Sequence, residues 1–141
     1  MTRLILAAGL FAATLTASLH AQTMNMQASI PFEFRIGSSV LPSGEYSIRN
    51  SGGLLFVKQT GGAHKGGIFM TVGEDRPAGS SAAGTLLFNR YGDTYFLSKV
   101  WPAGSKEAQK TPQTAREKEL ASHIGQPGTQ PGTTTVALQT K

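Results

Sequence analysis

Apolar and polar residues alternate one by one over residues 28–36, and this pattern constrains the fold more than any other feature of the chain. The apolar positions are Ala28, Ile30, Phe32, Phe34 and Ile36, and a polar residue or a proline stands between each and the next. Successive side chains of a β-strand point to opposite faces of the sheet. The segment therefore predicts a strand with one buried and one exposed face.

Turn signals divide residues 28–102 into about six strands of this kind. A Pro-Ser-Gly sequence follows Leu41, and an Asn-Ser-Gly-Gly sequence occupies residues 50–53. Further strands are expected at 54–59, 68–72, 85–90 and 94–101, with a glycine-rich loop at 61–67 and a long exposed connection at 74–83. We therefore predict an all-β fold, a single antiparallel β domain over residues 28–102. A sandwich and a partly closed barrel both fit, and a barrel would remove exposed strand edges.

The last two of these strands form a predicted hairpin around Gly92 and Asp93. With a two-residue turn, Tyr91 lies opposite Thr94. Arg90 then lies opposite Tyr95, on one face with Leu86, Phe88, Leu97, Lys99 and Trp101. Cross-strand pairs on such a face contribute roughly 0.2–1 kcal/mol each. The opposite face also carries apolar side chains, such as Leu87, Phe96 and Val100, and apolar groups on both faces predict a hairpin near the centre of the sheet.

The character of the chain changes after residue 102, and we predict a linker and one short helix over residues 103–125. Thr114 and Glu117 have the spacing of a capping box, in which each side chain bonds a free backbone amide of the first helical turn. Leu120 and Ile124 lie on one side of that helix, and Gly125 suits its end. Residues 126–141 are mostly Gln, Pro, Gly and Thr, so we predict a disordered tail.

Residues 1–21 have the composition of a secretory signal peptide. A positive residue, Arg3, precedes an uncharged apolar stretch at 4–19, and Ala21 offers a cleavage site, with a cut after Ala17 or Ser18 as the alternative. The stretch is shorter than the ~20 apolar residues of a bilayer span. We expect an N-terminal arm at residues 22–27, a mature chain with no membrane span, and a periplasmic or extracellular (secreted) location.

Composition excludes several classes of function. The chain has no cysteine, which excludes thiol catalysis and thiolate metal sites. Its net charge is +5, but the basic residues from Arg35 to Lys99 lie far apart in sequence, whereas nucleic-acid-binding proteins usually cluster them on one stripe or helix. No nucleic-acid partner is expected, and solubility, or weak attraction to anionic glycans or lipids, is the simpler interpretation of the charge.

Metal and cofactor sites are not expected either. His20 leaves with the signal peptide, and His64 and His123 lack the spacing of paired zinc ligands. Met24 and Met26 offer thioethers that suit Cu(I), but no third ligand stands nearby. We assign both methionines to the extended N-terminal arm.

The sequence also lacks a recognisable catalytic pattern, so we predict that the protein is not an enzyme. Glu33 and Glu45 fall on outward faces, and Glu74 and Asp75 are neighbours in a predicted loop, where acids do not converge across a cleft. No nucleophile elbow is present. The glycine-rich loop at 61–67 precedes a predicted strand, whereas a phosphate-binding loop requires a helix there.

The densest polar and aromatic group flanks the hairpin turn and contains Arg90, Tyr91, Asp93 and Tyr95. These residues are our candidates for a binding edge, because a guanidinium and aromatic faces pack on sugar rings and peptides. The structural alternative is that Asp93 serves the turn and Arg90 stacks on Tyr95 or pairs with Asp93.

Three segments together resemble a known group of proteins. They are residues 30–37 (IPFEFRIG), 41–46 (LPSGEY) and 88–97 (FNRYGDTYFL), and residues 116–121 (REKELA) fit the lysine- and glutamate-rich ending of the group. In these motifs the chain resembles small exported proteins common in acidobacteria, over roughly residues 28–121. The resemblance implies an exported bacterial protein and supplies no catalytic or binding residues.

The sequence favours a non-catalytic cell-envelope protein, a structural or interaction module whose partner is an envelope protein or a glycan. The alternative is a carrier of a small apolar ligand. Its cavity would be lined by Phe32, Phe34, Tyr46, Phe88, Leu97 and Trp101. A hydrolase, the third hypothesis, needs convergent acids or a histidine beside a nucleophile.

Overall fold

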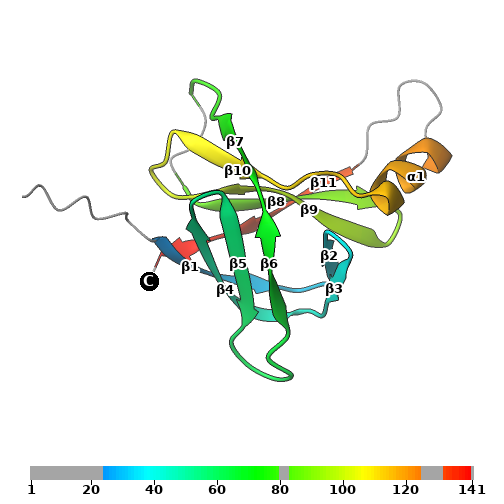
Figure 1. The fold of residues 1–141 in the computed structure, drawn as a ribbon, viewed down its shortest axis with the longest axis horizontal. Coiled ribbons are helices and arrows are strands. Elements are labelled where there is room, and N and C mark those ends of the chain that lie inside the picture. Colours follow the sequence, from blue (N-terminus) through cyan, green and yellow to red (C-terminus); the bar gives the residue numbers. More distant parts are fainter. Residues whose placement is uncertain (1–23, 80–82, 125–131, 141) are drawn as a thin grey trace, which may run out of the picture.

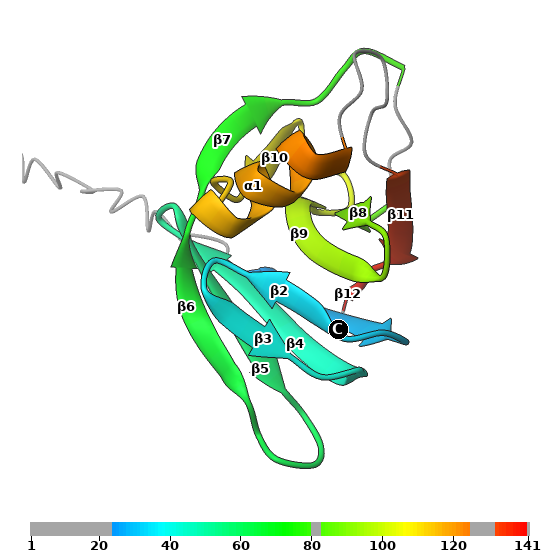
Figure 2. The same cartoon turned by 90° about the vertical axis from the view of Figure 1, so that its right-hand side faces the viewer.

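The structure, a computed structural model, describes residues 24–79, 83–124 and 132–140. Over these residues the chain forms twelve strands and one helix, and the strands make two sheets (Figure 1). The sheets lie against each other without closing into a barrel (Figure 2). The predicted all-β, sandwich-like fold is confirmed, although the strands outnumber the six expected.

The first sheet has five strands, all antiparallel. Their spatial order is β12 (Gln139–Thr140), β1 (Met24–Ile30), β4 (Gly44–Ser51), β5 (Leu54–Gln59) and β6 (Gly66–Met70). β6 is an edge strand, and the turn signal at residues 50–53 joins β4 to β5 as the sequence predicts.

The second sheet has seven strands. Its main path runs β11 (Gly132–Ala137), β8 (Thr85–Tyr91), β9 (Thr94–Trp101), β10 (Glu107–Lys110) and β7 (Val72–Asp75). Beside this path, β2 (Phe34–Ile36) pairs antiparallel with β3 (Ser39–Leu41) and parallel with β9. The β2–β9 pair is the one parallel contact among the strands of the described residues.

The alternating segment at 28–36 serves both sheets rather than one. Its first part belongs to β1 in the five-stranded sheet, and its last part forms β2 in the seven-stranded sheet. Pro31, which cannot donate a ladder hydrogen bond, lies in the crossing between them. Because the apolar face stays inward through the crossing, Ile30, Phe34 and Ile36 are all buried between the sheets.

Aromatic rings fill the core. The Phe34 ring packs edge-to-face on Tyr46 and on Phe88, with centroids 5.1 Å and 5.5 Å apart. Phe32 packs edge-to-face on Phe88 at 5.0 Å. These four residues are among those that the carrier hypothesis places around a cavity, and they contact one another instead. Such pairs contribute about 0.5–1.5 kcal/mol beyond the burial of their area.

The hairpin follows its predicted register at the turn and departs from it further along. Tyr91 lies opposite Thr94 and Arg90 opposite Tyr95, as expected. A bulge between Leu87 and Phe88 then shifts the pairing. A bulge inserts one extra residue and moves the following side chains to the other face. Lys99 and Trp101 consequently leave the face predicted for them, and both are half-buried.

The predicted N-terminal arm is wrong for residues 24–27. They belong to β1, which is hydrogen-bonded between β4 and β12. The Met26 side chain fills the core and is only 1% exposed, so it is not available as a metal ligand. The predicted signal peptide lies outside the described residues.

The predicted disordered tail is wrong for residues 132–140, which form β11 and β12. β11 pairs with β8 along its whole length, because alternate side chains of this polar segment are threonine and valine, which favour strands. Leu138 is buried and joins the hydrophobic core. Residues 126–131 and 141 lie outside the described part of the chain.

Two further strands lie in segments predicted to be irregular. β10 lies in the expected linker, and of its four residues only Ala108 is apolar and buried, so no alternation marks it. β7 contains Glu74 and Asp75, which the sequence places in a loop. The helix α1 (Ala115–Ile124) lies inside its predicted range.

Candidate functional site

The four residues predicted for a binding edge do not converge. Arg90 lies over the Tyr95 ring, with 5.6 Å from its Cζ to the ring centroid, and its Nε donates to the carbonyl of Gly92 at 2.7 Å. Tyr91 is buried on the opposite face of the hairpin, and Asp93 is exposed at the turn. In the described part of the chain, Asp93 has no hydrogen bond or ion pair.

Arg90 and Tyr95 have the predicted structural arrangement. The Tyr95 ring stacks on Phe32, with centroids 3.9 Å apart and planes 15° from parallel. Arg90 therefore covers the outer side of an aromatic stack that continues into the core through Phe88. The Arg90 guanidinium is therefore held by its hydrogen bond to the Gly92 carbonyl in the turn and by its contact with the Tyr95 ring.

A polar cluster that the sequence does not predict joins α1 to the seven-stranded sheet. Oε1 of the buried Glu117 accepts hydrogen bonds from Asn89 Nδ2 at 3.0 Å and from the Tyr91 hydroxyl at 3.2 Å. Burial, together with the charge of Glu117, raises the pKa of Tyr91 to about 12. The helix thus meets the sheet through Glu117, while Leu120 is half-buried and Ile124 exposed.

The predicted capping box is half formed. The backbone amide of Glu117 donates to Thr114 Oγ1 at 3.1 Å, as expected. The Glu117 carboxylate points to Asn89 and Tyr91 instead of returning to the amide of Thr114. The same residue therefore caps with its backbone and docks the helix with its side chain.

A cavity of about 440 Å³ lies beside this cluster, and Lys99, Lys110 and Glu117 are in its lining. Glu74 accepts a hydrogen bond from Lys99 and lies 3.8 Å from the Lys110 ammonium. The hydrogen bond from Lys99 is the main cause that lowers the pKa of Glu74. Because Lys99 and Lys110 both contact Glu74, these two charges are already engaged within the fold.

The outer face of the five-stranded sheet carries the more promising site. Two rows of side chains cross it from β1 to β6. The first row is Asn25, Arg49, Phe56 and Ile68, and the second is Gln27, Ser47, Lys58 and Gly66. His64 approaches from the β5–β6 loop, and a depression of about 420 Å³ forms between it and all of these residues except Gln27. We call Asn25, Ser47, Arg49, Phe56, Lys58 and His64 the basic depression.

The β5–β6 hairpin shapes one end of the basic depression. The backbone amide of Gln59 donates a hydrogen bond to the backbone carbonyl of Lys65 at 2.8 Å, which closes the loop. His64 has φ of 50°, and it is the one non-glycine residue of the described segments in the left-handed region. A Cβ on Gly66 would lie 2.2 Å from the carbonyl oxygen of Val57. Only glycine therefore lets β6 approach β5 so closely beside Lys58.

The charge of the basic depression is unbalanced. Its lining includes Arg49, Lys58 and His64 and no acidic residue. Neither Arg49 nor Lys58 forms an ion pair within the described segments. Glu45, the acid on the same face of β4, is exposed two residues beyond Ser47, outside that lining. An arrangement of this kind attracts an anion.

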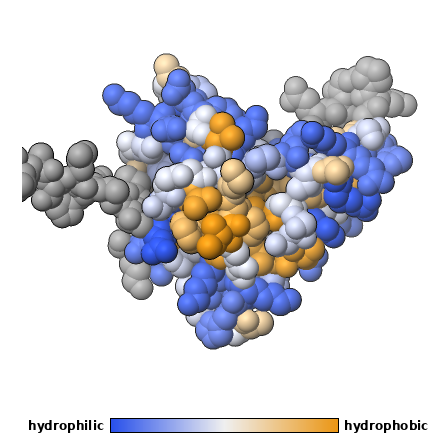
Figure 3. Space-filling view, in the orientation of Figure 1, coloured by the Kyte–Doolittle hydropathy of each residue, from blue (hydrophilic) through white to orange (hydrophobic). Residues whose placement is uncertain are grey.

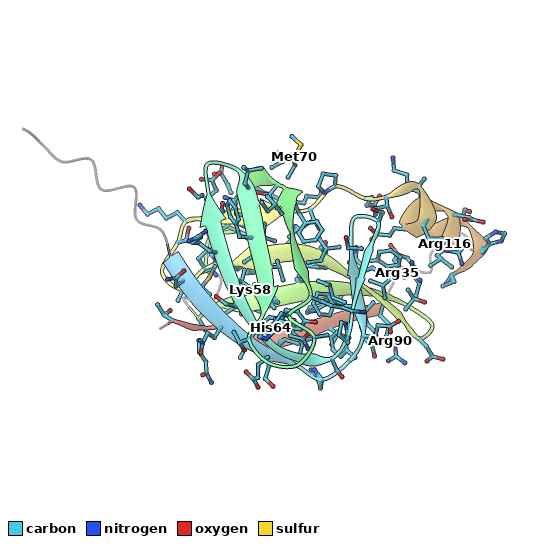
Figure 4. The ribbon with its side chains drawn as sticks, turned by 60° about the horizontal axis from the view of Figure 1, so that its bottom comes forward. Arg35, Lys58, His64, Met70, Arg90 and Arg116 are labelled. Atoms are coloured by element: carbon cyan, nitrogen blue, oxygen red, sulfur yellow. The ribbon has the colours of Figure 1, made fainter. Side chains whose placement is uncertain are left out.

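Exposed apolar side chains lie along β6 and the strands next to it in the chain, and one of them, Ile68, lines the basic depression. Ile68 and Met70 on β6 are 62% and 76% exposed, and Leu54 on β5 and Val72 on β7 are exposed as well. Figure 3 shows hydrophobic surface over β5 and β6. Figure 4 shows Lys58 and His64 close together on the five-stranded sheet, with Met70 at the far end of β6. The site thus combines cations with an exposed apolar border.

Sequence reasoning assigned these residues no site. Their positions are 25, 47, 49, 56, 58 and 64, and strand register alone brings them together. The available signal was the alternation in residues 45–49 and 54–59, which places Arg49, Phe56 and Lys58 on the face opposite the buried Ile48 and Leu55.

Other features of the described residues point to no further chemistry. No group of three or more His, Asp or Glu side chains in the described segments is arranged to hold a metal. Among the same residues, no helix has the length and apolar character needed to cross a bilayer. No protein family, curated protein or solved structure matches the chain.

Proposed function

We propose that this chain is an exported, non-catalytic binding module of the cell envelope, and that the basic depression is its contact surface. The observation that carries the proposal is the lining, in which Arg49, Lys58 and His64 stand without an acidic residue. Exposed cations without partners gain more from an external anion than cations already paired within the fold.

The arrangement of the other polar groups supports a binding role over catalysis. Tyr91, Asn89 and Glu117, the densest buried polar cluster, bond to one another and hold α1. His123 lies 4.0 Å from Glu119 on an exposed helix surface. A hydrolase needs a nucleophile, a base and an oxyanion site that converge on one reacting atom. Neither group has that arrangement.

The location in the envelope is inferred from the composition of residues 1–21 and from the resemblance described above. A net charge of about +4 after loss of Arg3 suits a partner that is anionic, as many envelope polymers and lipids are. The carrier alternative is less well supported, because Phe34, Tyr46 and Phe88 pack on one another.

Cosedimentation of the purified protein with its own envelope fraction tests the proposal. The double variant Arg49→Ser/Lys58→Ser removes two charges from the basic depression. The control Lys106→Ser/Lys118→Ser removes two exposed charges elsewhere. We expect the first variant to lose about tenfold in affinity, equivalent to roughly 1.4 kcal/mol. The control should bind like the unaltered protein.

Equal loss in both double variants would show that net charge alone governs retention, and it would overturn the basic depression as the contact surface. Cell fractionation with mass measurement tests the export part separately. Recovery of a chain that lacks about 21 residues from the envelope supports it. Recovery of the uncut chain from the cytoplasm alone overturns it.

A further inference from the structure

We infer that the ligand of the basic depression is an acidic polysaccharide, bound through a sugar ring that carries a carboxylate. The inference rests on the proposed function and names the chemical class of its partner. Three properties of the site support it. They are the spacing of the cations, the free neutral donors beside them, and the open apolar side of the depression.

Arg49 and Lys58 are spaced so that both can contact one anionic group. Arg49 pairs in register with Phe56, and Lys58 pairs with Ser47, so Arg49 and Lys58 are diagonal neighbours on adjacent strands. Diagonal neighbours lie roughly 7–8 Å apart, within reach of each other's long side chains. A carboxylate held between them can accept hydrogen bonds from the guanidinium and the ammonium together.

Arg49 is already positioned for this contact. Its Cζ lies 4.9 Å from the centroid of the Phe56 ring, so the ring restrains the guanidinium on the sheet surface. Stacking of this kind leaves the edge of the guanidinium free to donate hydrogen bonds. A restrained side chain loses less conformational entropy when a ligand binds.

The neutral residues favour a sugar over an isolated anion. The Asn25 amide and the Ser47 hydroxyl have no hydrogen-bond partner within the described residues, and both line the depression. Each can donate and accept, which matches the paired character of ring hydroxyl groups. Asn25 stands beside Arg49 in the first row, so a ring whose carboxylate meets Arg49 places its hydroxyls near Asn25.

The open side of the depression favours a polymer. The row through Lys58 ends at Gly66, which has no side chain, and the row through Arg49 ends at Ile68. Ile68 is 62% exposed and offers an apolar surface to the C–H face of a second ring. The volume of about 420 Å³ lies within the usual range of small-ligand sites, and the absence of a wall at β6 lets a chain continue.

Binding of defined polymers tests the inference, with the full chain produced in cells and purified from the envelope. The probes are polygalacturonate, neutral dextran and polyglutamate, compared by isothermal titration calorimetry at physiological ionic strength. We expect binding to polygalacturonate that is at least about tenfold tighter than binding to either of the others. Dextran lacks the carboxylate, and polyglutamate lacks the sugar ring.

Single variants assign the contacts. Arg49→Gln and Lys58→Gln should each weaken polygalacturonate binding about fivefold to tenfold, because each removes one charge-assisted hydrogen bond. Asn25→Ala should weaken polygalacturonate binding and leave polyglutamate binding unchanged. Lys106→Gln, an exposed lysine outside the depression, is the matched control and should change neither. Thermal unfolding of each variant confirms that it is folded.

The outcomes separate this inference from the proposed function. Equal affinity for polyglutamate and polygalacturonate would overturn the sugar and indicate an acidic polypeptide. No binding to polygalacturonate, with envelope cosedimentation that still depends on Arg49 and Lys58, would overturn the ligand class and leave the binding surface in place. If Arg49→Gln and Lys58→Gln both keep full polygalacturonate binding and full envelope cosedimentation, the ligand class and the proposed contact surface are both overturned.

Discussion

The hydroxyl of Tyr91 on β8 donates a hydrogen bond to Oε1 of Glu117 on α1, 3.2 Å away and 26 residues later in the chain. Both side chains are 4% exposed. A helix of ten residues is too short to be stable alone in water, where about 12–15 residues are the minimum. The bond to Glu117 is therefore a main link between the helix and the sheet.

We predict that Glu117→Ala lowers the free energy of unfolding by about 1–3 kcal/mol. The change leaves the buried Tyr91 hydroxyl and the half-buried Asn89 amide without their acceptor. Urea unfolding followed by circular dichroism measures the loss. Lys118→Ala, at the next and exposed position of the same helix, should change stability by less than about 0.5 kcal/mol. Equal losses in the two variants would contradict the docking role of Glu117.

Burial of the Tyr91 hydroxyl beside Glu117 predicts a response to alkaline pH. The pKa of Tyr91 is raised to about 12 in the folded protein, from the ordinary tyrosine value of 10.0. Between these values the unfolded chain releases a proton that the folded chain keeps, so stability falls as pH rises. This contribution is complete below about pH 10. Burial also raises the pKa of Tyr46, so part of the fall belongs to that residue.

Tyr91→Phe isolates the contribution of Tyr91. The variant should lose about 1 kcal/mol at neutral pH, since one buried hydrogen bond is removed. Its free energy of unfolding should then decline less between about pH 10 and 12 than that of the unaltered protein. Urea titrations at intervals across this range provide the measurement. Parallel curves for the two proteins would show that Tyr91 does not titrate differently on folding.

Local signals made part of this fold predictable. The hairpin register at Tyr91 and Thr94 follows from the Gly92-Asp93 turn. The hydrogen bond from the backbone amide of Glu117 to the Thr114 hydroxyl follows from the capping box. The bulge at Leu87 and Phe88 has no local signature, because it depends on how two sheets pack. Its effect on Lys99 and Trp101 was therefore missed.

The C-terminal strands and the candidate site were missed for two different reasons. Residues 132–140 are polar enough to favour disorder, yet the alternation of Thr134, Val136 and Leu138 suits a strand once β8 offers an edge. The basic depression depends on the register of four strands, so residues as distant as Asn25 and His64 become neighbours only in the folded sheet.

The C-terminal pairing gives the third prediction. Leu138 is 8% exposed, belongs to the core, and its amide donates to the carbonyl of Gly84 at 3.0 Å. Leu138→Ala should therefore cost about 2 kcal/mol in urea unfolding, at the low end for buried leucines because the site is near the sheet edge. Thr133→Ala, at an exposed position of β11, is the control and should cost less than about 0.5 kcal/mol. A cost for Leu138→Ala no larger than the control would mean that the C-terminal segment does not pack on the core.

Two glycines of the β5–β6 hairpin provide the last prediction, which links stability to the proposed site. A Cβ on Gly66 meets the Val57 carbonyl oxygen at 2.2 Å, whereas a Cβ on Gly61 meets nothing within 4 Å. Gly66→Ala must separate β5 from β6, and we expect a cost of about 1–3 kcal/mol. Because Lys58 and Ile68 lie on these two strands, the variant should also bind polygalacturonate several-fold more weakly, when measured below its unfolding temperature. Gly61→Ala should leave stability and binding unchanged. If both variants behave alike, the close approach of β5 and β6 does not shape the basic depression.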